Sequence, residues 1–296
     1  MAVPLAAHSM IMQITDPESW LNDFIQRGLQ EDIGSGDVTS MACIPSDSRK
    51  RARLLVKDTG VLAGVAVAER VFRTIDPSVE FIRHLDDGAD VKPGDIAFEV
   101  EAHARALLMG ERLVLNTMQR MSGIATESRR YRQAIADLPV RLLDTRKTTP
   151  LLRFLEKWAV RIGGCDNYRD GLFDWFMIKD NHIDACGGIV QAIERVAAYQ
   201  AEQGLNLNVT VEVRSLDELE LVLATGKVTR IMFDNFNTEM LREGVIRVNG
   251  RFETEASGGI TLERLREVAM TGVDFISVGA LTHSFRSLDL SLKMVK

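Results

Sequence analysis

Cationic side chains follow the predicted strands of the C-terminal half of the chain. Arg146 and Lys147 come shortly after one β-favouring run, and Lys179 comes directly after the next. Arg169 lies in the segment between these two runs. The planar guanidinium group of arginine suits a carboxylate, which it binds through two hydrogen bonds, whereas lysine serves as a point charge for a phosphate. These residues predict a site for a substrate that carries carboxylate and phosphate groups.

Two carboxylates occupy equivalent positions on later strands. Glu212 lies at the end of the run 208–213, and Asp234 ends the run 230–234. A sparse pair of carboxylates suits Mg²⁺, which keeps several waters and is shared with the phosphates of a substrate. We therefore expect Mg²⁺ as the cofactor, held by Glu212 and Asp234.

Glycine-containing segments follow the last two strands. Ser257, Gly258 and Gly259 open a predicted helix, and the backbone N–H groups at a helix N-terminus bind phosphate. Gly279 and Ala280 follow the sixth strand and would form the other half of the same site, as the last two loops of a barrel often do. This pattern predicts a pocket for a phosphate monoester.

These residues are positioned by short apolar strands that alternate with helices after Leu138. The six predicted strands are residues 140–144, 174–178, 208–213, 230–234, 251–256 and 274–278, and the predicted helices between them are 150–162, 188–203, 215–226, 237–249 and 261–272. Such alternation predicts a parallel sheet with right-handed crossovers. Because all six strands place charge or glycine at the same end, we favour an incomplete α/β barrel, whose strand ends meet at one mouth, over an open doubly wound sheet.

The N-terminal part has a different pattern. Trp20, Phe24, Ile25 and Leu29 have helical spacing behind the candidate caps Thr15 and Asp16, after a loose tail of about eleven residues. The following sequence predicts a loop at 33–45, a mostly antiparallel sheet within 51–101 with one helix near 65–74, and a long helix at 104–138 that is interrupted at Ser122-Gly123. A last helix is expected at 284–296.

Composition excludes several classes of protein. The chain has 296 residues and a formal net charge of −6, which is unlike the basic surface of a nucleic-acid-binding protein. It contains no apolar run of about 18 residues and no secretory signal pattern, so we expect a cytoplasmic protein without a membrane span. Cys43, Cys165 and Cys186 lack the spacing of a zinc site or a disulfide framework, which predicts free thiols.

The sequence resembles quinolinate phosphoribosyltransferase, the decarboxylating nicotinate-nucleotide pyrophosphorylase of NAD biosynthesis. The resemblance is carried by TRKTTPLLRFLEKWAVRIGGCDNYRDGLFDWFMIKDNHI (145–183), EDIGSGDVTS (31–40), ERLVLNTMQRMSGIAT (111–126), EASGGI (255–260) and ISVGALTHS (276–284). It extends from about Trp20 to the C-terminus. It implies an enzyme that joins quinolinate to phosphoribosyl pyrophosphate with loss of carbon dioxide.

The resemblance also implies roles for individual residues. The substrate-binding residues would be Arg112, Thr145, Arg146, Lys147, Tyr168, Arg169 and Lys179. Arg146, Arg169 and Lys179 would bind the two quinolinate carboxylates, and Lys147 would lie between the two substrates. Lys147, Glu212 and Asp234 would form the catalytic group, with both carboxylates holding Mg²⁺ and the ribose hydroxyls. The 5′-phosphate would lie at Ser257, Gly258, Gly259, Gly279 and Ala280.

The architecture that the resemblance implies has two domains. An open-faced α/β sandwich would span residues 12–122 and be joined by the C-terminal helix 284–296, and the barrel would span 123–283. The enzyme would be a homodimer or a higher oligomer, in which Arg112 reaches into the active site of the neighbouring subunit.

The sequence departs from the family at two positions. Where the family usually has Asn-His-Arg, this chain has Asn167-Tyr168-Arg169, so a phenol replaces an imidazole. A phenol can donate a hydrogen bond but carries no positive charge near neutral pH, so we expect weaker quinolinate binding. Cys165 replaces a glycine that is common in the family and is expected to affect loop freedom more than chemistry.

Three alternatives remain at this point. A barrel lyase with Lys179 as a Schiff base would need a lysine of lowered pKa in an apolar pocket. A nicotinate phosphoribosyltransferase without decarboxylation would need a clamp for only one carboxylate. A catalytically weakened binding protein on the same scaffold is suggested by Tyr168.

Overall fold

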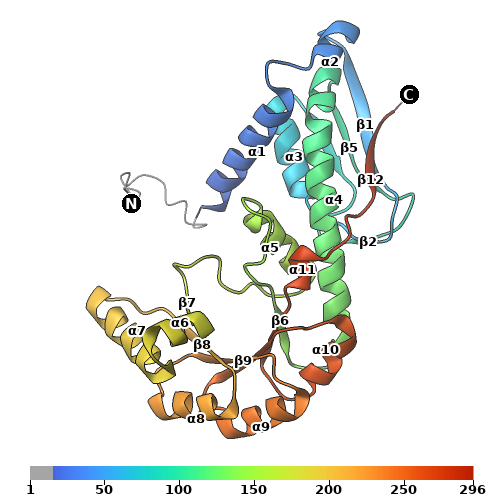
Figure 1. Cartoon of the computed structure of the whole chain (residues 1–296). Coiled ribbons are helices and arrows are strands. Elements are labelled where there is room, and N and C mark those ends of the chain that lie inside the picture. The colour runs from blue at the N-terminus through green and yellow to red at the C-terminus, as the bar shows by residue number, and fades with distance from the viewer. Residues whose placement is uncertain (1–15, 296) are drawn as a thin grey trace. The chain divides into compact units, whose positions relative to one another are not determined.

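The computed structural model describes residues 16–295 (Figure 1). These residues form two compact units: one contains the residues up to Gln119 together with those from Leu288 onward, and the other runs from Arg120 to Ser287. Helix α4 (Ala104–Ala134) begins in the first unit and ends in the second. The predicted loose tail lies outside the described residues.

The first unit contains a four-stranded antiparallel sheet. Its order is β12 (Leu290–Met294), β1 (Arg49–Val56), β5 (Ile96–His103) and β3 (Glu80–Arg83). Along β1, Ala52, Leu54 and Val56 are buried. Arg51 and Arg53 alternate with them and form ion pairs with glutamates of β5. The sheet therefore has one apolar and one charged face, as side chains of period two require.

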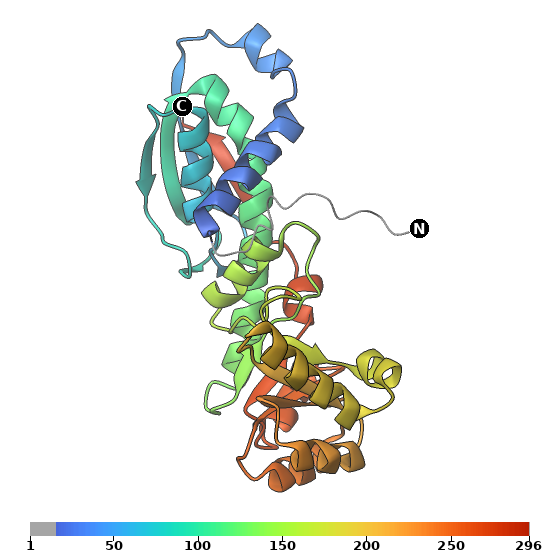
Figure 2. The ribbon, with the colours of Figure 1, turned by 90° about the vertical axis from the view of Figure 1, so that its left-hand side faces the viewer.

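Helices cover one face of this sheet. Figure 2 shows α1 (Pro17–Ile33), α3 (Val65–Ile75) and the first part of α4 on the same side of the strands. Asp16 caps α1 by accepting a hydrogen bond of 3.1 Å from the backbone N–H of Ser19. A short pair of strands, β2 (Gly60–Val61) and β4 (Asp90–Val91), completes the unit. The predicted open-faced α/β sandwich is confirmed.

Two local predictions for these segments were wrong. The predicted loop 33–45 contains a short helix, α2 (Val38–Cys43), which is capped by the side chain of Asp37. The predicted helix 284–296 is instead a loop followed by strand β12, which pairs antiparallel with β1. Leu288, Leu290 and Leu292 are all buried, a spacing of two that suits a strand once β1 offers a free edge.

The second unit is the predicted incomplete barrel. Its sheet is parallel and has the order β6 (Arg141–Leu143), β11 (Phe275–Ser277), β10 (Glu253–Ser257), β9 (Arg230–Asp234), β8 (Val209–Val213) and β7 (Phe176–Ile178). β11, the last of these strands along the chain, pairs with β6, the first, so the neighbours in the sheet follow the chain in cyclic order. A doubly wound sheet reverses its order instead. No ladder joins β6 to β7 among these described strands, and Leu143 bridges to Asp166 there instead.

Helices surround these strands. Figure 1 shows α7 (Ile189–Gln203), α8 (Leu216–Thr225), α9 (Thr238–Val248) and α10 (Leu262–Ala269) on the outside of the sheet. The unit also contains α5 (Arg153–Ile162) and two short helices that were not predicted, α6 (Asp180–Cys186) and α11 (Ala280–His283). None of the helices in the described range is long and apolar enough to cross a membrane.

The predicted interruption of the long helix at Ser122-Gly123 is absent, because α4 is continuous through these residues. A Cβ atom at Gly123 would lie 2.3 Å from the carbonyl oxygen of Arg286. Glycine therefore serves here for the close approach of another backbone segment and does not break the helix.

Candidate active site

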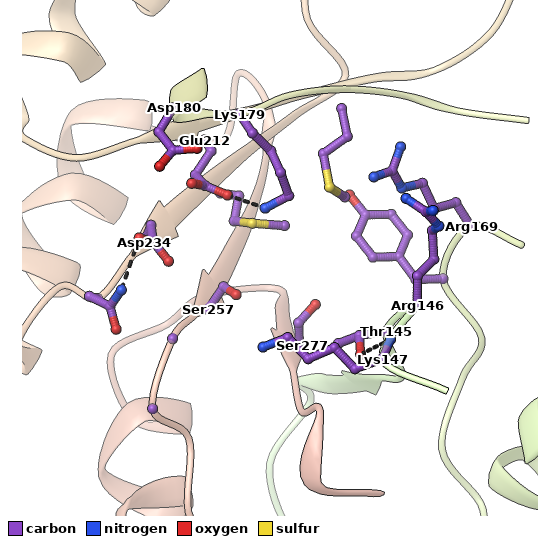
Figure 3. A pocket seen from close by; sticks show the side chains of 16 residues that line it. Thr145, Arg146, Lys147, Arg169, Lys179, Asp180, Glu212, Asp234, Ser257 and Ser277 are labelled. Atoms are coloured by element: carbon purple, nitrogen blue, oxygen red, sulfur yellow. Dashed lines mark hydrogen bonds and ion pairs between the residues drawn. The ribbon is translucent and has the colours of Figure 1, made fainter. Parts of the chain in front are cut away.

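A cavity of about 650 Å³ lies at the carboxyl ends of the barrel strands. It is lined by Thr145, Arg146, Lys147, Tyr168, Arg169, Met177, Lys179, Asp180, Glu212, Met232, Asp234, Asn235, Ser257, Gly258, Gly259 and Ser277. Figure 3 shows Arg146 and Arg169 on one side of the cavity, and Glu212 and Asp234 on the opposite side. The cavity thus has a cationic and an anionic wall.

The cationic wall contains two guanidinium groups without a carboxylate partner. Neither Arg146 nor Arg169 forms an ion pair with another described residue, and the buried Nε of Arg146 has no hydrogen-bond partner there. Burial lowers the pKa of Arg169, and the nearby Arg146 guanidinium lowers it further. Arginine stays charged even so. A buried arginine and a half-buried one in the same cavity, both without an ion pair to another described residue, favour the binding of an anionic ligand.

The opposite wall contains carboxylates from neighbouring strands. Glu212 is 7% exposed and pairs with the ammonium group of Lys179, which is 42% exposed. Asp234 accepts a hydrogen bond of 2.9 Å from the side-chain amide of Asn235. Lys179 is therefore a half-exposed, ion-paired lysine, which is the opposite of the apolar setting that a Schiff-base lyase would need.

His182 has a structural role beside this lysine. Its Nδ1 accepts a hydrogen bond of 3.0 Å from the backbone N–H of Lys179, which caps α6. The imidazole thereby fixes the turn after β7.

The glycine-containing loop follows β10 and precedes α10. Gly258 has φ 93° and Gly259 has φ 58°, values in the left-handed region that glycine adopts at little cost. Both residues line the cavity, where the lack of side chains leaves their backbone N–H groups open to a ligand. Such a loop ahead of a helix suits a phosphate group.

The segment that carries Tyr168 and Arg169 is anchored by a buried carboxylate. Asp144, which follows β6, is fully buried and accepts hydrogen bonds from Lys157 Nζ at 2.5 Å, Asn167 Nδ2 at 2.6 Å and the backbone N–H of Tyr168 at 2.9 Å. Burial raises the pKa of the Asp144 carboxyl, and the Lys157 ammonium opposes that shift. Asp144 therefore ties the loop after β6 to the segment before β7.

A second buried carboxylate, Glu156 of α5, anchors the same loop. It accepts hydrogen bonds from the backbone N–H of Thr149, at 3.2 Å, and from Nε of Arg120, at 2.9 Å. The loop that carries Arg146 and Lys147 is thus fixed on both sides by buried charge.

Tyr168 points its hydroxyl group away from the cavity and toward Thr210. The phenol oxygen lies 2.5 Å from Oγ1 of Thr210, which also accepts a hydrogen bond of 2.9 Å from the indole of Trp175. The rings of Tyr168 and Trp175 pack edge to face. Burial raises the pKa of Tyr168 well above its usual value, so the phenol is neutral. The cavity is therefore lined by the ring of Tyr168, while its hydroxyl is used in the barrel interior.

An ion pair lies beneath this aromatic group. Arg230 is 5% exposed, contacts Glu255 at 3.2 Å and stacks against the rings of Tyr168, Trp175 and Phe275. Fully buried Glu255 also accepts a hydrogen bond from Ser277, which lines the cavity. Burial raises the pKa of Glu255, and Arg230 opposes that shift. This pair fills the barrel interior with satisfied charge.

Protein-family models match both units. The model described as the C-terminal domain of quinolinate phosphoribosyl transferase matches residues 124–293, and the N-terminal domain model matches residues 37–122. The chain belongs to the quinolinate phosphoribosyltransferase family. The resemblance inferred from the sequence motifs is thus confirmed.

Individual members of the family are similar over most of their length. Quinolinate phosphoribosyltransferase [decarboxylating] 1b of Nicotiana tabacum is 46% identical over 291 residues, which cover 93% of this chain and 82% of the relative. The probable nicotinate-nucleotide pyrophosphorylase [carboxylating] of Bacillus subtilis is 45% identical and covers 88% of this chain and 89% of its own. The crystal structure of NadC from Streptococcus pyogenes superimposes with a TM-score of 0.87 at 37% identity, covering 93% and 97% of the two chains.

Most of the predicted site residues come together in this family member. Eleven of them line the cavity: Thr145, Arg146, Lys147, Tyr168, Arg169, Lys179, Glu212, Asp234, Ser257, Gly258 and Gly259. Gly279 and Ala280 are not among the lining residues, and Ala280 begins α11. A Cβ atom at Gly279 would lie 2.9 Å from Nε2 of His283 and 3.2 Å from Cδ of Lys147, so this glycine leaves room for both side chains. Arg112 lies on α4 in the first unit.

Five lining residues had no predicted role. They are Met177, Asp180, Met232, Asn235 and Ser277. Asn235 directly follows β9, and Asp180 follows Lys179 after β7, positions near strand ends that could have identified them. The methionines and Ser277 lie within strands, and their direction depends on how the barrel closes.

We expect Asp144→Asn to destabilise the protein by about 3–5 kcal/mol, because Lys157 would remain as an uncompensated buried charge. Urea unfolding measures this change. The matched double variant Asp144→Asn with Lys157→Met removes both charges and should recover most of the loss. A free energy of unfolding for Asp144→Asn that is within about 1 kcal/mol of the wild-type value, which is closer to the effect of a surface substitution, would contradict the role of Asp144 as a buried anchor.

Proposed function

We propose that this protein transfers a phosphoribosyl group from phosphoribosyl pyrophosphate to quinolinate, forming nicotinate mononucleotide, carbon dioxide and pyrophosphate. The observation that carries the proposal is the pair of unpaired guanidinium groups, Arg146 and Arg169, in the cavity that also contains the Ser257–Gly259 loop. One cavity thereby combines a clamp for carboxylates with a loop for a phosphate. Membership in the family supports this assignment.

The cationic wall would bind the pyridine ring. Arg146 and Arg169 each offer the planar donor set that matches a carboxylate. Lys179, which pairs with Glu212 on the opposite wall, would be a third cation for the substrate, as the resemblance implies. Quinolinate carries two adjacent carboxylates, whose combined charge would relieve the repulsion between the arginines. The ring of Tyr168 would form the apolar side of this subsite.

The opposite wall would bind the phosphoribosyl group. The 5′-phosphate would lie at the backbone N–H groups of Ser257–Gly259, and Glu212 and Asp234 would hold the ribose hydroxyls. Lys147 lines the cavity without an ion pair to another described residue and would lie between the two substrates. Gly279 and Ala280 would contribute to the phosphate site, as the resemblance implies.

Glu212 and Asp234 also fit a Mg²⁺ ion that is shared with the substrate. No group of three or more potential metal ligands occurs among residues 16–295, so a closed protein site is not formed there. Two carboxylates in a cavity suit Mg²⁺, whose remaining ligands are waters and substrate phosphates. When bound, the ion would neutralise charge on the leaving pyrophosphate.

The chain's own residues would act mainly by orientation and electrostatics. Arg146, Arg169 and Lys179 would fix the pyridine nitrogen opposite C1 of the ribose, so that the N–C1 bond forms as the C1–O bond to pyrophosphate breaks. The resulting pyridinium accepts the electron pair of the C2–carboxylate bond as carbon dioxide leaves. C2 then takes a proton from water. No nucleophilic side chain is required.

Experiment can distinguish the proposed function from two alternatives. A nicotinate phosphoribosyltransferase would bind a single carboxylate, whereas this cavity contains two arginines without an ion pair to another described residue, Arg146 and Arg169. A weakened binding protein would bind quinolinate without turnover, an alternative that Tyr168 motivates.

Location in the cytoplasm remains a prediction.

The purified protein with Mg²⁺ and phosphoribosyl pyrophosphate should convert quinolinate, but not nicotinate, into nicotinate mononucleotide with an equal amount of carbon dioxide. Chromatography of the nucleotide and trapping of labelled carbon dioxide measure both products. Product from nicotinate alone would transfer the assignment to the non-decarboxylating enzyme. Quinolinate binding without product would support the binding protein.

Tyr168→His should lower the KM for quinolinate by about tenfold, the equivalent of one charge-assisted hydrogen bond, because an imidazole can carry positive charge near neutral pH. Tyr168→Phe is the matched control. It should leave that KM within about twofold of wild type, since the hydroxyl faces Thr210. An unchanged KM in the histidine variant would refute the expected weakening by tyrosine.

We also propose a homodimer in which Arg112 enters the partner's active site. Arg112→Ala and Lys147→Ala should each be nearly inactive as separate proteins. Mixed and allowed to exchange subunits, they should regain about a quarter of wild-type activity, because a heterodimer then contains one intact site, as symmetry of the interface requires. Absence of recovery in mixtures shown to exchange would contradict the shared site.

A further inference from the structure

Asn235 lies where the two halves of the phosphoribosyl subsite meet. It directly follows β9, and it lines the cavity. The parallel register of β9 and β10 places Asp234 opposite Ser257. Asn235 is therefore adjacent both to a carboxylate and to the first residue of the glycine-containing loop.

Asn235 makes a bond to each of these neighbours. Its side-chain amide donates to Oδ2 of Asp234 at 2.9 Å, and its backbone N–H donates to the carbonyl oxygen of Ser257 at 2.9 Å. The first bond fixes the direction of the carboxylate. The second fixes the start of the loop.

The side chain of Asn235 also occupies the space beside Gly258. A Cβ atom at Gly258 would lie 2.2 Å from Oδ1 and 2.5 Å from Cγ of Asn235. Any side chain at position 258 would therefore collide with this amide, and Gly258, with φ 93°, lets the Asn235 side chain lie against the loop. The Ser257–Gly259 loop and the Asn235 side chain therefore lie in close contact.

The backbone of Asn235 explains why this residue type occurs here. Its φ is 56°, in the left-handed region, which among residues with a side chain is best tolerated by asparagine and aspartate. Aspartate would place a second negative charge next to Asp234, and glycine would lose the amide. Asparagine alone of these three combines the conformation with a neutral donor.

We propose that Asn235 is a positioning residue for the phosphoribosyl group, which orients the Asp234 carboxylate and the Ser257–Gly259 loop relative to each other. This inference rests on the proposed function and extends it to a residue to which no role was assigned. Asn235 acts through its neighbours, so its loss should affect the phosphoribosyl ligand and spare the pyridine ligand.

The test uses Asn235→Gly, which keeps the left-handed backbone and removes only the side chain. Asn237→Gly is the matched control: Asn237 caps α9 by accepting from the backbone N–H of Met240, and glycine at a cap costs only a few tenths of a kcal/mol. Calorimetry measures the Kd of ribose 5-phosphate and of quinolinate, and turnover gives the KM of phosphoribosyl pyrophosphate. Thermal unfolding reports on stability.

Asn235→Gly should raise the Kd of ribose 5-phosphate and the KM of phosphoribosyl pyrophosphate by about tenfold, as loss of one hydrogen bond to a charged group does. The Kd of quinolinate and the Tm should stay near wild type, and Asn237→Gly should change neither ligand. A Kd for ribose 5-phosphate within twofold of wild type would overturn the inference. An equal increase in the Kd of ribose 5-phosphate and of quinolinate would also overturn it. A wild-type protein that does not bind ribose 5-phosphate would do the same.

The binding measurement separates this inference from the proposed function. Wild-type protein that binds ribose 5-phosphate but forms no product from quinolinate would refute the proposed function, and the selective effect of Asn235→Gly would still stand. Normal turnover with no effect of Asn235→Gly would refute only the inference.

Discussion

The like charge of Arg146 and Arg169, held together without a counter-ion from the described residues, is the constraint on which the site depends. Burial disfavours the charged form of Arg169, and the nearby Arg146 guanidinium adds to that cost. The arrangement persists because each arginine lies on a segment that is fixed from behind. Buried Asp144 joins the two segments, and buried Glu156 holds the loop after β6. The stable surrounding fold thus holds the two arginines close together despite the unfavourable free energy of their like charges, which an anionic ligand would reduce.

The opposite wall shows a complementary distribution of charge. Glu212 and Asp234 lie on adjacent strands, and each is satisfied within the described chain, by Lys179 and Asn235 respectively. The barrel makes this separation possible, because consecutive strands deliver their ends to different parts of one mouth. In the proposed function a dicarboxylate would lie at the arginines, and the hydroxyls and Mg²⁺ of a phosphorylated sugar would lie at the carboxylates.

Much of this site could be predicted from the sequence because strand ends are a property of chain order. The runs before Arg146, Lys179, Glu212 and Asp234 are apolar and short, and the alternation with helices places their ends on one face. Details that depend on a distant partner could not be predicted. The leucines after residue 287 became a strand only because β1 offered an edge.

Side-chain direction was similarly hidden from the sequence. The hydroxyl of Tyr168 faces Thr210, a residue 42 positions further along the chain, so its expected role as a donor toward the substrate could not be judged from the motif. Asn235 follows a strand like the other site residues, but its contact with Gly258 appears only once β9 and β10 pair.

The most direct test of the arginine pair is the equilibrium binding of quinolinate and nicotinate, which differ by the second carboxylate. Titration calorimetry should give a Kd for quinolinate that is about tenfold or more below that for nicotinate, as an added charge-assisted contact requires. In Arg146→Ala this difference should largely disappear. Equal affinity for both ligands in the wild-type protein, or a preference for quinolinate that survives in Arg146→Ala, would contradict the central role of the pair.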